Sequence, residues 1–335
     1  MMAMVSATAL PHKVIGEGRP VVLFVHGFLD GGSIWEDVAG GLNNAGMTVA
    51  TVNLPGMAGT PAAPDEISLD SYASFVASAV DAIGGQLVLV GQSMGAQVVE
   101  LAAQLRPNAI KGLVLLTPVP LGGVGAPEDV VAPFKSAGGR ADLQRQQRIG
   151  LSHKLSDEAL DTLLKLGLEV RPDAVARLVD VWNAGHEAGR SPSEFDGPVL
   201  IIRGASDPFV TAETASHVLG RFEHAKLVTV AAAGHWAHVE QPAEVARLIR
   251  EFVEQVGLVG AGGAASAADW RAAFYQKTRT AFGQAFAADV VLEAVTLIKP
   301  VRGRDNVQRV METASKVYSA LKFTDQATAG NKQYV

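Results

Sequence analysis

The chain has 335 residues, of which 48% are hydrophobic and 19% charged, and its formal net charge is −6 at pH 7. A chain of this length and apolar content buries a large core and has room for two domains. The acidic balance argues against nucleic-acid binding, which normally needs a basic face. The longest apolar runs fall far short of the roughly 18 residues that a membrane-spanning helix requires, so we expect no membrane span.

The sequence contains no cysteine, which excludes disulfides, thiolate metal sites and a cysteine nucleophile. The N-terminal stretch MMAMVSATALPHKV has no Lys or Arg ahead of its short apolar part, a pattern that disfavours a secretory signal. We therefore expect a cytoplasmic protein.

Short apolar runs alternate with helical patterns over the first 258 residues. The expected strands lie in RPVVLFVHG, MTVATVNLP, QLVLVGQS, IKGLVLLTP, PVLIIRGAS and AKLVTVAAAGH. Runs rich in Val, Leu and Ile without strict alternation are typical of parallel strands buried on both faces. The sequence thus predicts an α/β fold with a doubly wound, mostly parallel sheet. Such sheets bind ligands beyond the carboxyl ends of their strands.

The first of these strands ends in LFVHGFLDGG, where a His-Gly turn directs the backbone N–H of Phe28 toward the expected site. Phe28 and Leu29 are therefore expected to line a substrate pocket. Asp30 has two interpretations: it either caps the helix that begins near Ser33, which we expect, or binds a polar group of the substrate.

The segment LVLVGQSMGAQVV places Ser93 between a buried strand and a helix, in the pattern Gly-x-Ser-x-Gly. Glycines at 91 and 95 permit the close approach that a strained serine turn requires, which is the arrangement of a nucleophile elbow. Ser93 is the candidate nucleophile. The N–H of Met94 is a candidate donor to an oxyanion, and we expect its side chain to line the pocket.

Between about 121 and 196 the chain leaves the sheet for four helical patterns, which we interpret as a helical cap. Its apolar residues, Phe134 and Trp182 among them, are expected to form the core of the cap, and Trp182 is also a candidate pocket residue.

Two later strands supply partners for Ser93. Asp207 in RGASDPFV and His235 in AAAGHWAHVEQP each lie just beyond the carboxyl end of a strand. A serine needs a base, and the base needs an acid that fixes its tautomer, so His235 is the candidate base and Asp207 the candidate acid. His238 is the rival base in the same loop. Trp236, next to the base, is a candidate pocket residue.

Five segments together, VHGFLDGG, VNLPGMAGT, VGQSMGAQ, RGASDPFV and AGHWAHVEQP, resemble the motifs of the α/β-hydrolase fold family in its order of serine, acid and histidine. The resemblance covers residues 1–258 and implies a serine hydrolase of a carboxylic ester or lactone, acting on a small molecule with no metal or organic cofactor. The Gly-His-Trp of GHWAH is similar to meta-cleavage C–C hydrolases, which leaves C–C hydrolysis as an alternative. A ligand receptor with very slow turnover is a second alternative.

After the first 258 residues the composition changes. GLVGAGGAASAAD contains an expected linker, 259–268, and 269–335 reads as helix, strand, helix and strand. This last part resembles a partial SnoaL-like domain of the nuclear-transport-factor-2-like cone fold. An open sheet edge favours association, so we expect a homo-oligomer contact there.

Overall fold

The computed structural model describes residues 12–258, 290–292, 299–317, 327–329 and 332–334. The chain divides into two compact units, Met1–Leu258 and Val259–Val335. No helix of the described residues is both long and apolar enough to cross a membrane.

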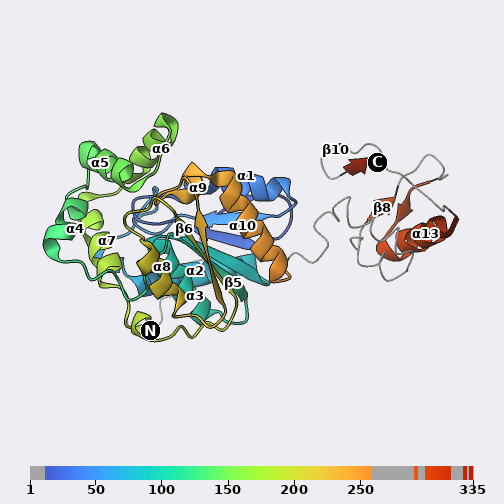
Figure 1. Ribbon diagram of the computed structural model, residues 1–335, viewed down its shortest axis with the longest axis horizontal. Helices are drawn as coiled ribbons and strands as arrows, with labels where there is room; N and C mark the ends of the chain where they lie inside the picture. Colours follow the sequence, from blue (N-terminus) through green and yellow to red (C-terminus); the bar gives the residue numbers. More distant parts are fainter. Residues whose placement is uncertain (1–11, 259–289, 293–298, 318–326, 330–331, 335) are drawn as a thin grey trace. The chain divides into compact units, whose positions relative to one another are not determined.

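A seven-stranded sheet forms the centre of the first unit, in the order β1-β3-β2-β4-β5-β6-β7 (Figure 1). The strands are β1 (His12–Ile15), β2 (Val22–Val25), β3 (Val49–Val52), β4 (Leu87–Gln92), β5 (Ile110–Leu116), β6 (Val199–Gly204) and β7 (Ala225–Val230). β1 pairs antiparallel with β3, and every other pairing is parallel. The predicted doubly wound, mostly parallel sheet is confirmed.

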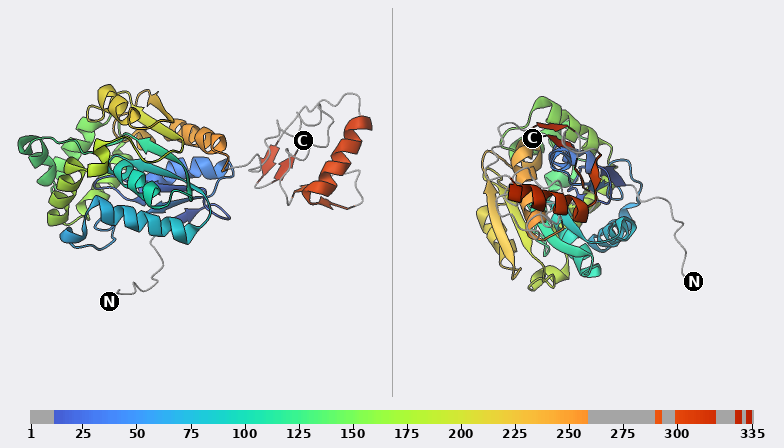
Figure 2. Two further views of the ribbon diagram at one scale, coloured as in Figure 1. Left: turned by 90° about the horizontal axis from the view of Figure 1, so that it is seen from below. Right: turned by 90° about the vertical axis from the view of Figure 1, so that its right-hand side faces the viewer.

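Helices cover both faces of this sheet (Figures 1 and 2). They are η1 (Gly32–Trp35), α1 (Glu36–Asn44), η2 (Pro64–Glu66), α2 (Leu69–Ile83), α3 (Met94–Leu105), α8 (Ala212–Leu219), α9 (Ala237–Glu240) and α10 (Pro242–Gln255). α1 packs against α10, and α2 packs against α3. β2, β3 and β4 are buried along their whole length, because helices lie on both sides of them.

The edge strand β1 was not among the predicted strands. Its sequence, HKVI, begins with two polar residues and its Val14 is 44% exposed, so the segment lacks the apolar run that marked the others. Its partner β3 supplies the register, with Ile15 opposite Val49.

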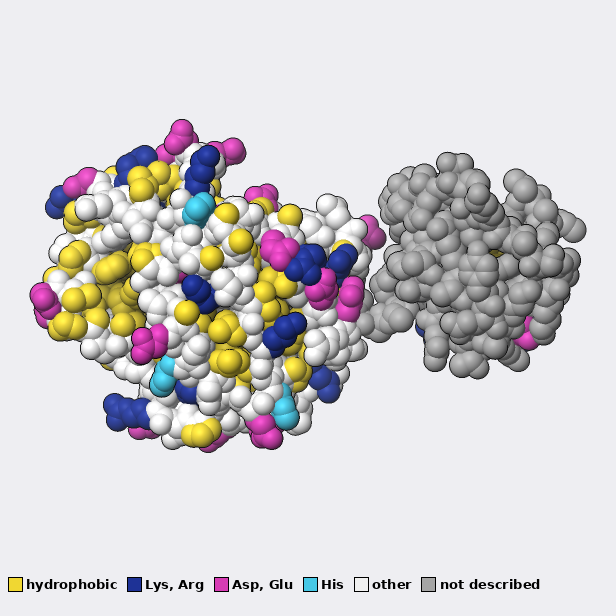
Figure 3. All heavy atoms as spheres, viewed as in Figure 1, with side chains coloured by type: hydrophobic (Ala, Val, Ile, Leu, Met, Phe, Trp, Pro, Cys, Tyr) yellow, Lys and Arg dark blue, Asp and Glu magenta, His cyan; other side chains and the backbone are white. Residues whose placement is uncertain are grey.

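Between β5 and β6 the chain forms a set of helices at one end of the sheet, which we call the cap (Figure 1). It comprises α4 (Glu128–Lys135), α5 (Ala141–Leu151), α6 (Asp157–Leu168), α7 (Pro172–Ala184) and η3 (Glu187–Arg190). On the face shown in Figure 3, hydrophobic side chains gather over α4 and α7. The cap lies beyond the carboxyl ends of the strands, where the sequence places the candidate site.

The second unit is described only in part. Its elements are β8 (Val291–Leu292), β9 (Val301–Arg302), α13 (Arg304–Val317), β10 (Ala327–Ala329) and β11 (Lys332–Tyr334). β8 pairs antiparallel with β9, and β10 with β11. The predicted linker 259–268, the first helix of the predicted cone-fold segment and much of its remainder lie outside the described residues.

Candidate active site

Ser93 lies in a tight turn between β4 and α3. Its backbone has φ 55° and ψ −120°, a conformation that costs a non-glycine residue free energy and projects the side chain out of the turn. A Cβ at Gly91 would collide with the carbonyl of Gly95, and a Cβ at Gly95 would lie 2.6 Å from the carbonyl oxygen of His26. The two glycines therefore allow the turn to close against its neighbours.

His235 joins the other two predicted residues in one chain of hydrogen bonds. Its Nε2 lies 2.9 Å from the hydroxyl oxygen of Ser93, and its Nδ1 lies 2.8 Å from Oδ2 of Asp207. The backbone of His235 is also held, because its carbonyl accepts a hydrogen bond from the hydroxyl of Thr117 at 2.9 Å and from the amide of Gln92 at 3.1 Å. With Nδ1–H donating to the carboxylate, Nε2 is free to accept the proton of Ser93.

Asp207 remains ionised although it is buried. Burial alone would raise the pKa of its carboxyl group, but attraction to His235, the hydrogen bond from His235 and the N–H groups of Val210 and Phe209 together hold the pKa below its ordinary value. A charged acceptor at this position orients the imidazole and stabilises its protonated form.

Two backbone N–H groups are available beside Ser93. Within residues 12–258, the N–H groups of Phe28 and Met94 donate no hydrogen bond. Phe28 follows the carboxyl end of β2 and Met94 is the first residue of α3, so both belong to segments next to the serine turn. Unsatisfied N–H groups at such a place are suited to an anionic oxygen.

His26 braces the turn that precedes Phe28. Its Nδ1–H donates to the carbonyl of Gly27 at 2.9 Å, and its Nε2 accepts the N–H of Leu54 at 3.0 Å. Burial lowers the pKa of this histidine, more than the bond to Gly27 and the charge of Asp30 raise it. A neutral imidazole with one donor and one acceptor nitrogen matches both contacts.

Asp30 does not cap a helix, and that prediction was wrong. η1 begins at Gly32 with Gly31 as its N-cap and no side-chain capping bond. The Asp30 carboxylate instead accepts hydrogen bonds from Arg148 of α5 at 2.9 Å and from the indole of Trp236 at 3.0 Å. A buried carboxylate needs donors, and a cation from the cap satisfies it better than the start of a short helix.

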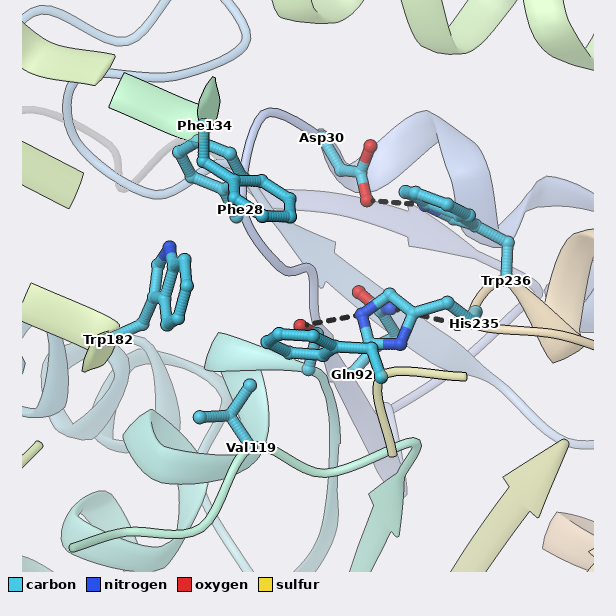
Figure 4. Close-up of a pocket in the computed structure, with 10 residues that line it drawn as sticks. Phe28, Asp30, Gln92, Val119, Phe134, Trp182, His235 and Trp236 are labelled. Atoms are coloured by element: carbon cyan, nitrogen blue, oxygen red, sulfur yellow. Dashed lines mark hydrogen bonds between the residues drawn. The ribbon is translucent and has the colours of Figure 1, made fainter. Parts of the chain in front are cut away.

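Ser93 and His235 line a small, largely aromatic cavity of about 40 Å³. The lining consists of Phe28, Asp30, Gln92, Ser93, Val119, Phe134, Trp182, Phe209, His235 and Trp236. Phe28, Phe134 and Trp182 lie across the cavity from His235 and Trp236 (Figure 4). The Trp182 ring makes edge-to-face contacts with Phe209 at 5.6 Å and with Phe134 at 5.9 Å between ring centroids.

The predicted pocket residues divide into two groups. Phe28, Trp182 and Trp236 line the cavity, whereas Leu29 does not: it is buried in the hydrophobic core. The side chain of Met94 likewise belongs to that core and not to the pocket, contrary to expectation. At both positions the side chain packs in the interior.

Sequence reasoning missed two aromatic lining residues. Phe134 was assigned to the core of the cap, and Phe209 was not singled out, although it follows Asp207 by two residues. That short distance from the candidate acid was the available signal for Phe209. For Phe134 no local signal existed, because helical periodicity does not show which apolar residue of a cap faces the sheet.

His238, the rival base, lies in the core. Its ring stacks on Trp35 with centroids 4.3 Å apart, and neither ring nitrogen has a hydrogen-bond partner in the described part of the chain. Burial lowers its pKa to about 3; the charge of Asp30 opposes this shift and that of His235 adds to it. His238 is therefore neutral in the folded protein at any pH where the protein is expected to work.

The free energy of unfolding should fall in acid because His238 is protonated more readily in the unfolded chain. In the unfolded chain this group takes up a proton near pH 6.5, whereas in the folded protein it does so only near pH 3. Stability is therefore present above about pH 6.5 and is lost as pH falls toward 3, by up to about 1.4 kcal/mol per pH unit. His238→Phe keeps the stacking and removes the titration, so in urea unfolding its free energy should fall less between pH 7 and pH 5 than that of the wild type, by about 2 kcal/mol. Equal losses in both proteins would contradict this role.

Among the described residues there is no group of three or more His, Cys, Asp or Glu side chains that is arranged to hold a metal ion. The carboxylates near the candidate site are engaged with other partners: Asp30 with Arg148 and Trp236, and Asp207 with His235.

Comparison with known proteins agrees with this architecture. The model of the alpha/beta hydrolase family matches residues 22–248, about two thirds of the chain. The chain belongs to the alpha/beta hydrolase family. The match includes all three residues of the Ser93–His235–Asp207 hydrogen-bond chain. It ends before the C-terminal unit, so it lends no support to the predicted SnoaL-like resemblance of 269–335.

Relatives of this alpha/beta hydrolase include enzymes with different reactions. The sn-1-specific diacylglycerol lipase ABHD11 of Mus musculus is 25% identical over an alignment of 252 residues, and the match covers 70% of this chain and 81% of the relative. A 2-hydroxy-6-oxononadienedioate/2-hydroxy-6-oxononatrienedioate hydrolase of Burkholderia vietnamiensis is 26% identical and covers 72% of this chain and 89% of its own. The protein is a hydrolase of the alpha/beta-hydrolase superfamily.

Among solved structures, an esterase from Exiguobacterium antarcticum superposes with a TM-score of 0.67 at 16% sequence identity, covering 72% of this chain and 94% of its own. At that identity the likeness concerns the fold alone.

Proposed function

We propose that the protein is a serine hydrolase that cleaves a carboxylic ester or lactone through an acyl-enzyme. The observation that carries this proposal is the continuous hydrogen-bond chain from Ser93 through His235 to Asp207, with two unbonded N–H groups beside the serine. A serine with a base at 2.9 Å and an oriented acid has the geometry that nucleophilic acyl transfer requires.

In the proposed reaction His235 takes the proton of Ser93 as the serine oxygen bonds to the substrate carbonyl carbon. The N–H groups of Phe28 and Met94 donate to the oxyanion of the tetrahedral intermediate. His235 then gives the proton to the departing alkoxide oxygen, and the acyl group remains on Ser93. Water attacks the acyl-enzyme with its proton passing to His235, and collapse of the second intermediate returns that proton to Ser93 and releases the acid.

The cavity favours a small apolar acyl group. A space of about 40 Å³ holds about three water molecules. Phe28, Phe134, Trp182 and Phe209 make most of its wall apolar, and a long acyl chain would crowd these rings. We therefore infer acyl groups of two to three carbons as the preferred class.

A panel of p-nitrophenyl esters tests the proposal and its size limit. We expect steady turnover of the acetate and propionate and a kcat/KM for the octanoate at least about tenfold lower. Phe134→Ala should raise kcat/KM for the octanoate relative to the acetate by about tenfold, because it removes one wall of the cavity. Val130→Ala on the exposed side of α4 is the control and should leave the ratio unchanged. An unchanged ratio in Phe134→Ala would contradict the proposal that the acyl group binds against Phe134.

Carbon–carbon hydrolysis is the second candidate, favoured by the C–C hydrolase relatives and by Trp236 next to the base. The substrates named for those relatives are dianions at neutral pH. Of the ten lining residues, all within 12–258, none is Lys or Arg, and the nearby Arg148 is already paired with Asp30. This charge balance favours a neutral ester. Cleavage of a dienoic diketone acid without cleavage of simple esters would reverse the preference.

A further inference from the structure

One segment of the cap contacts three of the loops around the candidate site, those that carry Phe28, Asp207 and His235. It consists of the end of α5 and the residues that follow it, 148–154. Hydrogen bonds join Arg148 to Asp30 and Leu29, Leu151 to His235, and His153 to Ser206. The approach is close: a Cβ at Gly234, just before the base, would lie 2.5 Å from the carbonyl oxygen of Leu151. The cap is thus part of the frame that holds these loops.

Arg148 makes the deepest of these contacts. Its side chain donates from Nη1 to the carboxylate of Asp30 at 2.9 Å and from Nη2 to the carbonyl oxygen of Leu29 at 2.8 Å. The guanidinium also lies over the indole ring of Trp236, 5.1 Å from its centroid. Arg148 is 3% exposed and Asp30 1% exposed, so solvent does not weaken the pair. Arg148 itself does not line the cavity.

The loop that Arg148 holds is conformationally unfavourable. Leu29 has φ 58°, in the left-handed region that a bulky side chain rarely adopts. Such a conformation persists only where the surroundings fix it. Arg148 fixes both the carbonyl of Leu29 and the side chain of the next residue, and the N–H of Phe28 immediately precedes them. The fork of Arg148 thus braces the two residues that follow Phe28.

We propose that Arg148 is a positioning residue: from the cap, it holds the Leu29–Asp30 backbone so that the N–H of Phe28 points at the substrate oxyanion. The inference rests on the proposed serine hydrolase mechanism. Asp30 is also linked to the segment that carries the base. The indole N–H of Trp236, the residue after His235, donates to the second carboxylate oxygen of Asp30 (Figure 4). The oxyanion hole is then complete only with the cap in place.

A second buried pair provides a matched control. Arg221 donates to Glu100 at 2.8 Å and to the backbone carbonyls of Ser191 and Ala188, and it too is nearly inaccessible. It contacts none of the residues that line the cavity. A role in stability alone predicts similar effects for changes at the two arginines, whereas positioning predicts an effect on catalysis only at Arg148.

The test compares Arg148→Lys with Arg221→Lys in the full chain. A lysine keeps the charge but has one ammonium group, which cannot reproduce two parallel bonds to Asp30 and Leu29. For p-nitrophenyl acetate, Arg148→Lys should lower kcat by about 10- to 100-fold with KM changed by less than about threefold. The inhibition constant of a trifluoromethyl ketone, whose adduct places an oxyanion in the same hole, should rise by the same factor. Arg221→Lys should change neither by more than about twofold.

Unchanged kcat and unchanged ketone inhibition in folded Arg148→Lys would overturn the inference. If Arg148→Lys does not fold, Asp30→Asn, which keeps the shape of the side chain but removes its charge, is judged by the same two readouts. The wild type is measured first, with p-nitrophenyl acetate and a fluorophosphonate. A wild type that neither turns over the ester nor is labelled contradicts the proposed function itself, which separates that failure from failure of the role of Arg148.

Discussion

Ser93→Ala is expected to lower kcat for p-nitrophenyl acetate by about 10⁴- to 10⁶-fold while the protein stays folded. Alanine removes the hydroxyl that His235 contacts at 2.9 Å and leaves the turn glycines in place. The residual rate comes from the oxyanion donors and from binding alone. Because alanine also carries a Cβ, the φ of 55° is no more strained in the variant than in the wild type.

Ser78→Ala is the matched control for this change. Ser78 lies on the exposed side of α2, where its hydroxyl donates to the carbonyl of Ser74 within the same helix. Its variant should retain the full rate. Circular dichroism and the melting temperature of both variants show whether the fold is intact. A folded Ser93→Ala enzyme with the wild-type rate would eliminate the acyl-enzyme mechanism.

Asp207→Asn is expected to reduce kcat by about 10⁴-fold with little change in KM. An amide in place of the carboxylate can present an N–H to Nδ1 of His235, which moves the ring proton to Nε2 and leaves no acceptor for the proton of Ser93. It also removes the negative charge that stabilises the protonated ring. Asp161→Asn, on the exposed surface of α6, is the control and should be without effect on kcat.

Measuring the loss of kcat in Asp207→Asn at two pH values distinguishes a lasting role of the carboxylate from an effect of its own protonation. The pKa of Asp207 lies below its ordinary value of 3.8, so its carboxylate stays charged throughout the range from pH 5 to pH 8. The stability that its ionisation contributes is complete above about pH 5 and is lost as pH falls below the unfolded value of 3.8 and through the lowered folded value. The deficit of Asp207→Asn should therefore persist at both pH 6 and pH 8. A deficit that disappears at either pH would contradict the assignment.

The meeting of the three candidate residues could be predicted from the sequence because parallel strands align their carboxyl ends. Ser93, Asp207 and His235 lie 28 to 142 positions apart, yet each follows a strand of the same sheet, so the sheet order alone brings them together. The strand–turn–helix pattern around Ser93 could be predicted from neighbouring residues alone. In the structure β4 ends at Gln92 and α3 begins at Met94.

The pocket and its supports could not be predicted in this way. Asp30 and Arg148 are 118 residues apart, and their pairing depends on how a cap helix packs over a loop, which strand order does not determine. The same applies to Phe134, which helical periodicity assigns to the cap core. For Leu29 the sequence predicted the right segment but the wrong direction of the side chain, because the local pattern does not reveal the positive φ at this position.

The most direct test of the central proposal is the identity of the residue that reacts. The protein is incubated with a fluorophosphonate, digested, and the labelled peptide is sequenced by mass spectrometry. We predict one equivalent of label on Ser93 in the wild type, competition by p-nitrophenyl acetate, and loss of labelling in Ser93→Ala. Label on another residue, or esterase turnover with Ser93 unlabelled, would contradict the mechanism proposed for this hydrolase.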